Sequence, residues 1–135
     1  MEPIFENDLT GSIGTQKYLC TIKWRNGQLI MDEPEKTGGK DLGIDPFSTL
    51  LASLAGCTLS TLRMYIDRIE WDIPEINISL NLYQENTTDF TTVIKRDISF
   101  SKAISPEQEE RLLLIAEKCP ISKLLKGKIT INTNL

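Results

Sequence analysis

The feature that most constrains the fold of this chain is a long apolar segment, which begins at Asp45-Pro46 and continues to about Arg68 or Glu70. An aspartate at the N-cap followed by proline at the first helical position is a common helix start. Apolar side chains cover nearly the whole circumference of the first four turns, and such a helix must be enclosed on all sides. One small domain can hardly enclose it, so we expect a second copy of the chain to bury the remaining face in an obligate homodimer.

Composition limits the chemistry that this chain can perform. Its 135 residues, with three cysteines and no histidine, are expected to form a single domain, residues 1–135. Lack of histidine removes the commonest general base, and without a Cys-x-x-Cys spacing we expect no metal. The net charge of -4 and the scattered basic residues argue against a nucleic-acid partner. We expect a cytoplasmic protein with no membrane partner and no cofactor, since neither a secretory signal nor about 18 continuous apolar residues is present.

Strand patterns lie on both sides of the long helix. Residues 17–24 and 28–31 are predicted as two strands joined at Asn26-Gly27, a dipeptide that favours a type I′ turn. Residues 32–45 are predicted as a loop because they carry three glycines and a proline without apolar periodicity. Residues 75–85 alternate between apolar and polar side chains, which indicates a half-buried antiparallel strand. Its expected partner is the segment 91–100, across a loop at 86–89.

A second helix is predicted in the last third of the chain. Ser105-Pro106 with Gln108 forms a capping box, and the helix is expected to reach Cys119, where Pro120 ends or kinks it. A helical turn at 122–126 with Gly127 as its C-cap, then a strand at 128–133, complete the predicted order. The fold class is therefore α+β, with antiparallel sheets and the order ββαββααβ.

Cys57 and Cys119 are the candidate reactive residues. Cys57 shares a helix face with Leu50, Leu54 and Met64, so it points to packed interior or to a closed pocket. Gly56 beside it is costly in a helix and favours the close approach of a ligand or of another backbone. A second thiol 62 residues later (119 − 57) allows an attacking and resolving pair, although both residues can also be inert core cysteines.

Cys119 suits the resolving role better, because the negative end of a helix disfavours a thiolate. Cys20 alternates with apolar residues in the first strand and is expected to fill the core. A reactive thiol also needs a nearby cation. The candidates are Arg25, Arg63, Arg68 and Arg96. Arg63 lies about 240° around the helix from Cys57, too far to reach it within one chain.

Several motifs together resemble the OsmC/Ohr family of organic hydroperoxide resistance and osmotically inducible proteins. They are Gly38-Gly39-x-x-x-Gly43-x-Asp45-Pro46, Leu50-Leu51-Ala52-Ser53-Leu54-Ala55-Gly56-Cys57-Thr58, Thr61-Leu62-Arg63-Met64-Tyr65 with Trp71, and Ile115-Ala116-Glu117-Lys118-Cys119-Pro120. The resemblance implies an intertwined homodimer with long central helices between antiparallel sheets and active sites at the subunit interface. It also implies reduction of organic hydroperoxides, with Cys57 as the peroxidatic thiol and Cys119 as the resolving thiol.

The resemblance assigns the activating role to Arg25, because Arg25-Asn26-Gly27 is similar to the family's arginine motif at the end of its first strand. The peroxidase branches have a glutamate after the proline that begins the long helix, and this chain has Phe47 there. In those branches the glutamate carboxylate pairs with the activating arginine and orients it, and this chain lacks that carboxylate. The end of the helix is more similar to a less characterised OsmC-like branch.

The leading hypothesis is a cysteine-based organic hydroperoxide reductase, an antioxidant enzyme of the oxidative-stress response. Its Cys57 sulfenic acid is resolved by Cys119, and an unidentified dithiol reductant regenerates the thiols. An apolar pocket lined by Phe47, Leu50 and Leu54 would favour organic peroxides. One alternative is a non-catalytic small-molecule-binding or redox-sensing protein on the same scaffold. Another is a purely structural dimer whose cysteines are buried.

Overall fold

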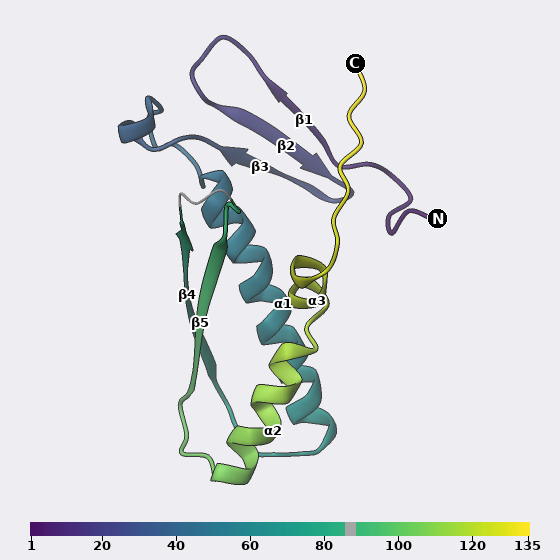
Figure 1. The fold of residues 1–135 in the computed structure, drawn as a ribbon, viewed down its shortest axis with the longest axis vertical. Helices are drawn as coiled ribbons and strands as arrows, with labels where there is room; N and C mark the ends of the chain where they lie inside the picture. Colours follow the sequence, from purple (N-terminus) through teal and green to yellow (C-terminus); the bar gives the residue numbers. More distant parts are fainter. Residues whose placement is uncertain (86–88) are drawn as a thin grey trace. The chain divides into compact units, whose positions relative to one another are not determined.

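The computed structural model describes residues 1–85 and 89–135, so the predicted loop at 86–89 lies mostly outside the described residues. The chain divides into two compact units, Met1–Leu50 and Leu51–Leu135, which are described separately. The first unit contains a three-stranded antiparallel sheet in the order β1-β2-β3 (Figure 1). Its elements are β1 (Thr10–Ile13), β2 (Cys20–Trp24), β3 (Gly27–Met31) and a short 3-10 helix, η1 (Glu35–Thr37).

The predicted hairpin of β2 and β3 is confirmed, but its turn lies one residue earlier than predicted. Trp24 pairs with Gly27, so Arg25 and Asn26 form the turn. The type I′ prediction is wrong, because neither turn residue has a positive φ. Gly27 has a packing role instead: a Cβ there would lie 2.7 Å from Cζ2 of the Trp24 ring.

The strand β1 was not predicted. All four of its residues are exposed, so the segment carries no alternation of apolar and polar side chains that would indicate a half-buried strand. It pairs antiparallel with β2, from Thr10 opposite Lys23 to Ile13 opposite Cys20. The predicted strand at 17–24 is correspondingly shorter, since only Cys20–Trp24 has strand geometry.

The carboxylate of Asp32 organises the loop that follows β3. Asp32 is only 2% exposed, and Oδ1 accepts the backbone N–H groups of Tyr18 at 3.2 Å and Glu33 at 2.8 Å. Oδ2 accepts the N–H groups of Lys40 at 3.3 Å and Leu42 at 3.2 Å. Burial raises the pKa of Asp32, but the four N–H donors together outweigh it and hold the pKa below its usual value.

Replacing Asp32 by asparagine is therefore expected to destabilise the first unit. The amide nitrogen must face two N–H donors whichever way the side chain turns. Because the folded pKa of Asp32 is depressed, its stabilisation is present above the unfolded pKa and is lost as the pH falls through the folded value. Urea unfolding followed by Trp24 fluorescence should show a lower midpoint for Asp32→Asn at neutral pH, with a gap to the wild type that narrows below about pH 4. The exposed Glu35→Gln is the matched control, and equal midpoints for both variants would refute this role.

The predicted long helix is confirmed as α1 (Pro46–Arg68), which begins in the first unit and continues through the second. The side chain of Asp45 accepts the N–H of Ser48 at 3.0 Å, as expected of an N-cap residue. The strands β4 (Ile76–Gln84) and β5 (Thr92–Phe100) form the predicted antiparallel hairpin. Burial alternates along β4, which confirms that it is half-buried.

The helix α2 (Pro106–Glu117) begins with the predicted capping box: Ser105 and Gln108 each bond the other's backbone N–H. The core of the second unit lies where α1, α2 and the β4-β5 hairpin meet, and Figure 1 shows the hairpin running alongside α1. Its buried members come from the two helices and the segment after α1. They are Leu62, Ile66, Ile73, Leu112, Ile115 and Ala116.

One prediction for the end of the chain is wrong. The helix α2 ends at Glu117, before Pro120 as predicted, and the predicted helical turn at 122–126 is part of a third helix, α3 (Pro120–Lys126). Pro120 opens this helix because proline fits the first helical position, where its missing N–H costs nothing. The predicted Gly127 C-cap is confirmed. The predicted strand at 128–133 is not formed in the described chain, where this segment has no strand pairing. The order is therefore βββαββαα, apart from η1, within the predicted α+β class.

The described residues bury only part of the surface of α1. Its buried residues form a single stripe at four-residue spacing, Leu54, Thr58, Leu62 and Ile66. Other apolar residues are open to solvent, including Phe47, which is 58% exposed, and Met64, which is 71% exposed. By length and composition α1 passes the test for a membrane-crossing helix, a test that the core helix of a soluble protein also passes.

Candidate active site

The second unit brings the two predicted thiols together. Cys57 lies in the middle of α1, and its Sγ accepts the backbone N–H of Ile121 at 3.5 Å. Ile121 is the second residue of α3, two positions after Cys119. The Cys57 and Cys119 side chains lie near enough to shift each other's pKa, and all three cysteines are free. Residues 62 positions apart in the sequence (119 − 57) therefore meet in one site.

Cys119 occupies the junction between two helices. Its N–H donates to the carbonyl of Ala116 at 3.2 Å, which closes α2, and its carbonyl accepts the N–H of Lys123 at 3.1 Å, which opens α3. The expected position of Cys119 at the end of α2, whose negative dipole disfavours a thiolate, is incomplete. Cys119 is also the N-cap of α3, where the first backbone N–H groups have no partner within the helix and can donate to a sulfur.

The two sulfurs differ in acidity and in access. Burial raises the pKa of Cys57, the neighbouring Cys119 raises it further, and the N–H of Ile121 only partly offsets them. Burial also acts to raise the pKa of Cys119, but the Cys57 thiol, the N–H and hydroxyl of Ser122 and the hydroxyl of Thr58 together lower it. The first proton of the pair therefore leaves from Cys119. Cys119 is fully buried and Cys57 is partly exposed, so Cys57 is the sulfur that an external molecule can reach.

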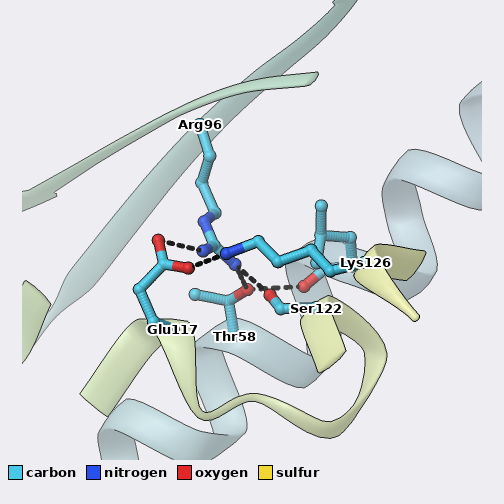
Figure 2. Close-up of polar contacts among 6 residues, drawn as sticks. Thr58, Arg96, Glu117, Ser122 and Lys126 are labelled. Carbon is cyan, nitrogen blue, oxygen red and sulfur yellow. Dashed lines mark hydrogen bonds and ion pairs between the residues drawn. The ribbon is translucent and has the colours of Figure 1, made fainter. Parts of the chain in front are cut away.

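A buried arginine cluster lies against the same helices. Figure 2 shows the guanidinium of Arg96 reaching from β5 to hydroxyls on α1 and α3. Its Nη1 donates to Oγ1 of Thr58 and to Oγ of Ser122, both at 2.8 Å. Thr58 is fully buried, Ser122 is 4% exposed, and the Arg96 side chain is only 12% exposed.

Acidic and basic side chains complete the arginine cluster. Nη2 of Arg96 pairs with Oε1 of Glu117 at 3.3 Å, and Oε2 of Glu117 pairs with Lys126 (Figure 2). Lys126 and then Arg96 hold the pKa of Glu117 below its usual value against the opposing effect of burial. Glu117 thus remains ionised and orients the guanidinium beside the two hydroxyls.

Arg96 was predicted only as one of four candidate cations, and Thr58, Ser122, Glu117 and Lys126 were not predicted. A signal was present in the strand pattern. Arg96 occupies an inward position of β5, in phase with Ile94 and Ile98 on the half-buried face. An arginine on an apolar face must find buried partners, because an unpaired buried charge is costly. That periodicity could have selected Arg96.

The other predicted site residues have no described contact with either thiol, and three of them belong to the first unit. Leu54 is buried, three residues before Cys57 on α1, whereas Phe47 and Leu50 are exposed on the part of α1 that belongs to the first unit. Arg25 also belongs to the first unit, where it helps to line a cavity of about 380 Å³ with Trp24, Leu9 and residues 5–7. Their roles at the thiols stay predictions.

Three further findings concern neighbouring features. A Cβ at Gly56 would meet nothing within 4 Å, so no described residue outside the adjoining turns of α1 approaches that position closely. Cys20 is partly buried in the first unit and its Sγ donates to the carbonyl of Tyr18 at 3.6 Å. Among the described residues there is no group of three or more cysteine, aspartate or glutamate side chains that could hold a metal ion.

The family model for OsmC-like proteins matches residues 38–134, which include both thiols and the whole arginine cluster. The chain belongs to the OsmC-like protein family. The resemblance of its cysteine motifs to this family is thereby confirmed. No curated protein matches this OsmC-like chain.

Solved structures share the fold of this OsmC-like protein at low sequence identity. An OsmC-like protein from Mycoplasma pneumoniae has a TM-score of 0.71 at 21% identity, covering 93% of this chain and 90% of its own. The organic hydroperoxide resistance protein OhrB of Bacillus subtilis has a TM-score of 0.67 at 18% identity, covering 93% of each chain. One from Elizabethkingia anophelis has a TM-score of 0.70 at 15% identity, covering 93% of this chain and 92% of its own. These likenesses establish the fold.

Proposed function

We propose that this OsmC-like protein is a thiol peroxidase that reduces organic hydroperoxides at Cys57 and Cys119. The observation that carries the proposal is that Cys57 Sγ accepts the N–H of Ile121, two residues after Cys119, so the two thiols share one site at the junction of α1, α2 and α3. Two neighbouring thiols can interconvert with a disulfide whose geometry their backbones permit. The names of the neighbours from Bacillus subtilis and Elizabethkingia anophelis give hydroperoxide resistance as their role, which supports the same substrate class.

In the first step the sulfur of Cys57 attacks the distal oxygen of the hydroperoxide ROOH. A sulfur–oxygen bond forms and the O–O bond breaks, so Cys57 is oxidised to a sulfenic acid and the peroxide is reduced to an alkoxide. Cys119, the more acidic sulfur, starts as the thiolate, its own proton having passed to solvent, and accepts the Cys57 proton as attack proceeds. That proton then passes to the alkoxide, and the alcohol ROH leaves.

In the second step the sulfur of Cys119 attacks the sulfur of Cys57. The disulfide forms, the sulfur–oxygen bond breaks, and the oxygen leaves as water after taking up a proton. One hydroperoxide and two thiols thus give one alcohol, one water and one disulfide. An external dithiol of the cytoplasm then reduces the protein disulfide and is itself oxidised, so the cycle requires no bound cofactor.

The peroxide assay that tests this function compares two substrates. Apolar side chains of α1 such as Leu54 would bind the hydrocarbon part of cumene hydroperoxide and give it an advantage of about 2 kcal/mol, or roughly thirtyfold in rate, over hydrogen peroxide. Peroxide loss is followed with a dithiol as the reductant and the protein in catalytic amounts. If neither peroxide is consumed faster than in the absence of protein, the function is wrong. A thiol pair that oxidises only once without turnover would indicate a redox sensor instead.

We also propose that the protein acts as a homodimer. The exposed apolar residues of α1, including Met64, need a partner surface, and the open space at Gly56 could admit a second backbone. Light scattering on the eluting protein should give twice the mass of one 15.3 kDa chain. A mass of one chain at micromolar concentration would refute the dimer.

A further inference from the structure

We propose that Arg96 is a positioning residue for the thiol pair, because its guanidinium holds the hydroxyls of Thr58 and Ser122 so that Ser122 presents its proton to the sulfur of Cys119. This inference rests on the proposed function, since it assigns the cation that prepares the pair for peroxide. The residues involved all lie within the second unit. They come from four elements: α1, β5, α2 and α3.

The hydrogen atoms of the cluster determine which hydroxyl can serve the sulfur. The two N–H bonds of Arg96 Nη1 point to Thr58 Oγ1 and Ser122 Oγ, so both hydroxyl oxygens act as acceptors. Thr58 donates its own proton to the carbonyl of Leu54 at 2.8 Å. Ser122 lies in the first turn of α3, three residues after the N-cap Cys119, and hydrogen bonding from its hydroxyl lowers the pKa of the Cys119 thiol more than the Thr58 hydroxyl does. The main route therefore runs from the guanidinium through Ser122 to Cys119.

A cation at one end of a series of hydrogen bonds strengthens the hydrogen bond at the other end. A hydroxyl that accepts a hydrogen bond from a charged donor is polarised and becomes a better donor itself. The effect is larger in a buried setting, where the local dielectric constant is low, and neither Thr58 nor Ser122 is more than 4% exposed. Arg96 can thus stabilise negative charge on Cys119 without touching the sulfur.

The other arginines considered from the sequence have different partners. Arg63 donates to Asp67 at 3.3 Å and to the carbonyl of Pro74 at 3.2 Å. The guanidinium of Arg68 lies over the ring of Tyr65, with 5.6 Å to its centroid. In the described part of the second unit, the charged groups of the arginine cluster are Arg96 from β5, Glu117 from α2 and Lys126 from α3. Glu117 also pairs with Lys126, so it neutralises the positive charge of the Arg96 guanidinium only in part. The guanidinium can therefore still polarise the two hydroxyls.

The test is a pH titration of the thiols in the absence of peroxide. Thiolate formation is followed by its ultraviolet absorbance in a Cys20→Ser background, so that only Cys57 and Cys119 contribute as thiols. Arg96→Met is expected to raise the pH of the first ionisation by about one unit, because a nearby positive charge no longer favours the thiolate. In Arg96→Lys the rise in this pH should be smaller than in Arg96→Met, since lysine restores the positive charge but not the fixed pair of N–H donors of the guanidinium.

Two further variants separate positioning from structural support. Ser122→Ala keeps the guanidinium but removes the hydroxyl that donates to the sulfur, so it should raise the pH of the same ionisation. Arg63→Met removes one charge elsewhere on α1 and is the matched control, with little expected shift. The inference is overturned if Arg96→Met shifts the ionisation no more than Arg63→Met, or if Ser122→Ala has no effect. Failure of the wild type to consume peroxide would refute the function, but it would leave this titration unchanged.

Discussion

Replacing Cys57 by serine is expected to slow the consumption of cumene hydroperoxide by at least about a thousandfold, because a hydroxyl is a far weaker nucleophile than a thiolate at neutral pH. The effect should be large because Cys119, the other sulfur of the site, is fully buried and cannot meet the peroxide in its place. The measurement is peroxide loss at saturating dithiol, with kcat and KM determined separately. Circular dichroism of the variant confirms that the fold is kept.

Two other cysteine variants complete this experiment. Cys20→Ser is the matched control, since Cys20 lies in the first unit and bonds only the carbonyl of Tyr18 among the described partners. It should retain wild-type turnover. Cys119→Ser should react once and stop as a Cys57 sulfenic acid, which a dimedone label detects. Peroxide consumption that survives in Cys57→Ser would place the reaction elsewhere.

Leu62→Ala is expected to lower the free energy of unfolding by about 2–5 kcal/mol. Leu62 is fully buried at the centre of the core formed by α1, α2 and the β4-β5 hairpin. Truncation removes buried methyl groups and leaves a cavity that the packed helices can fill only in part. Urea unfolding monitored by Trp71, which packs against this core, measures the change.

Leu113→Ala is the matched control for this core substitution. Leu113 lies on α2 next to the buried Leu112 but is 59% exposed, so the same truncation should change the free energy of unfolding by no more than about 0.5 kcal/mol. Similar losses in the two variants would show that the core is not where we place it. The packing of α1 on α2 also brings Cys57 to Cys119, so Leu62→Ala should impair both stability and thiol contact.

The sequence predicted the elements that have strong local signals. The N-cap at Asp45 and the capping box at Ser105 define helix starts through side chains within three residues, and both helices begin as predicted. Signals that depend on distant partners were missed. Exposed β1 forms by pairing with β2, and Trp24 packing on Gly27 moved the hairpin turn by one residue. The absent strand at 128–133 has the right composition but no strand to pair with in the described chain.

For the site, the sequence identified the residue types but not their environment. The motifs selected Cys57 and Cys119, and the fold brings them together. The acidity of Cys119 could not be inferred because Pro120 was interpreted as a stop, whereas it begins α3 and makes Cys119 an N-cap. The partners of Arg96 come from three other elements, so their meeting depends on tertiary packing. The sequence pattern indicated only that Arg96 lies on the half-buried face of β5.

Identification of the disulfide formed on contact with peroxide tests the central claim most directly. The reduced protein is mixed with one equivalent of cumene hydroperoxide and quenched in acid, and the remaining thiols are alkylated before peptide mass analysis. The account predicts a rapidly formed disulfide between the Cys57 and Cys119 peptides, with Cys20 alkylated. Peroxide loss with both Cys57 and Cys119 still free, or a disulfide that includes Cys20, would contradict it.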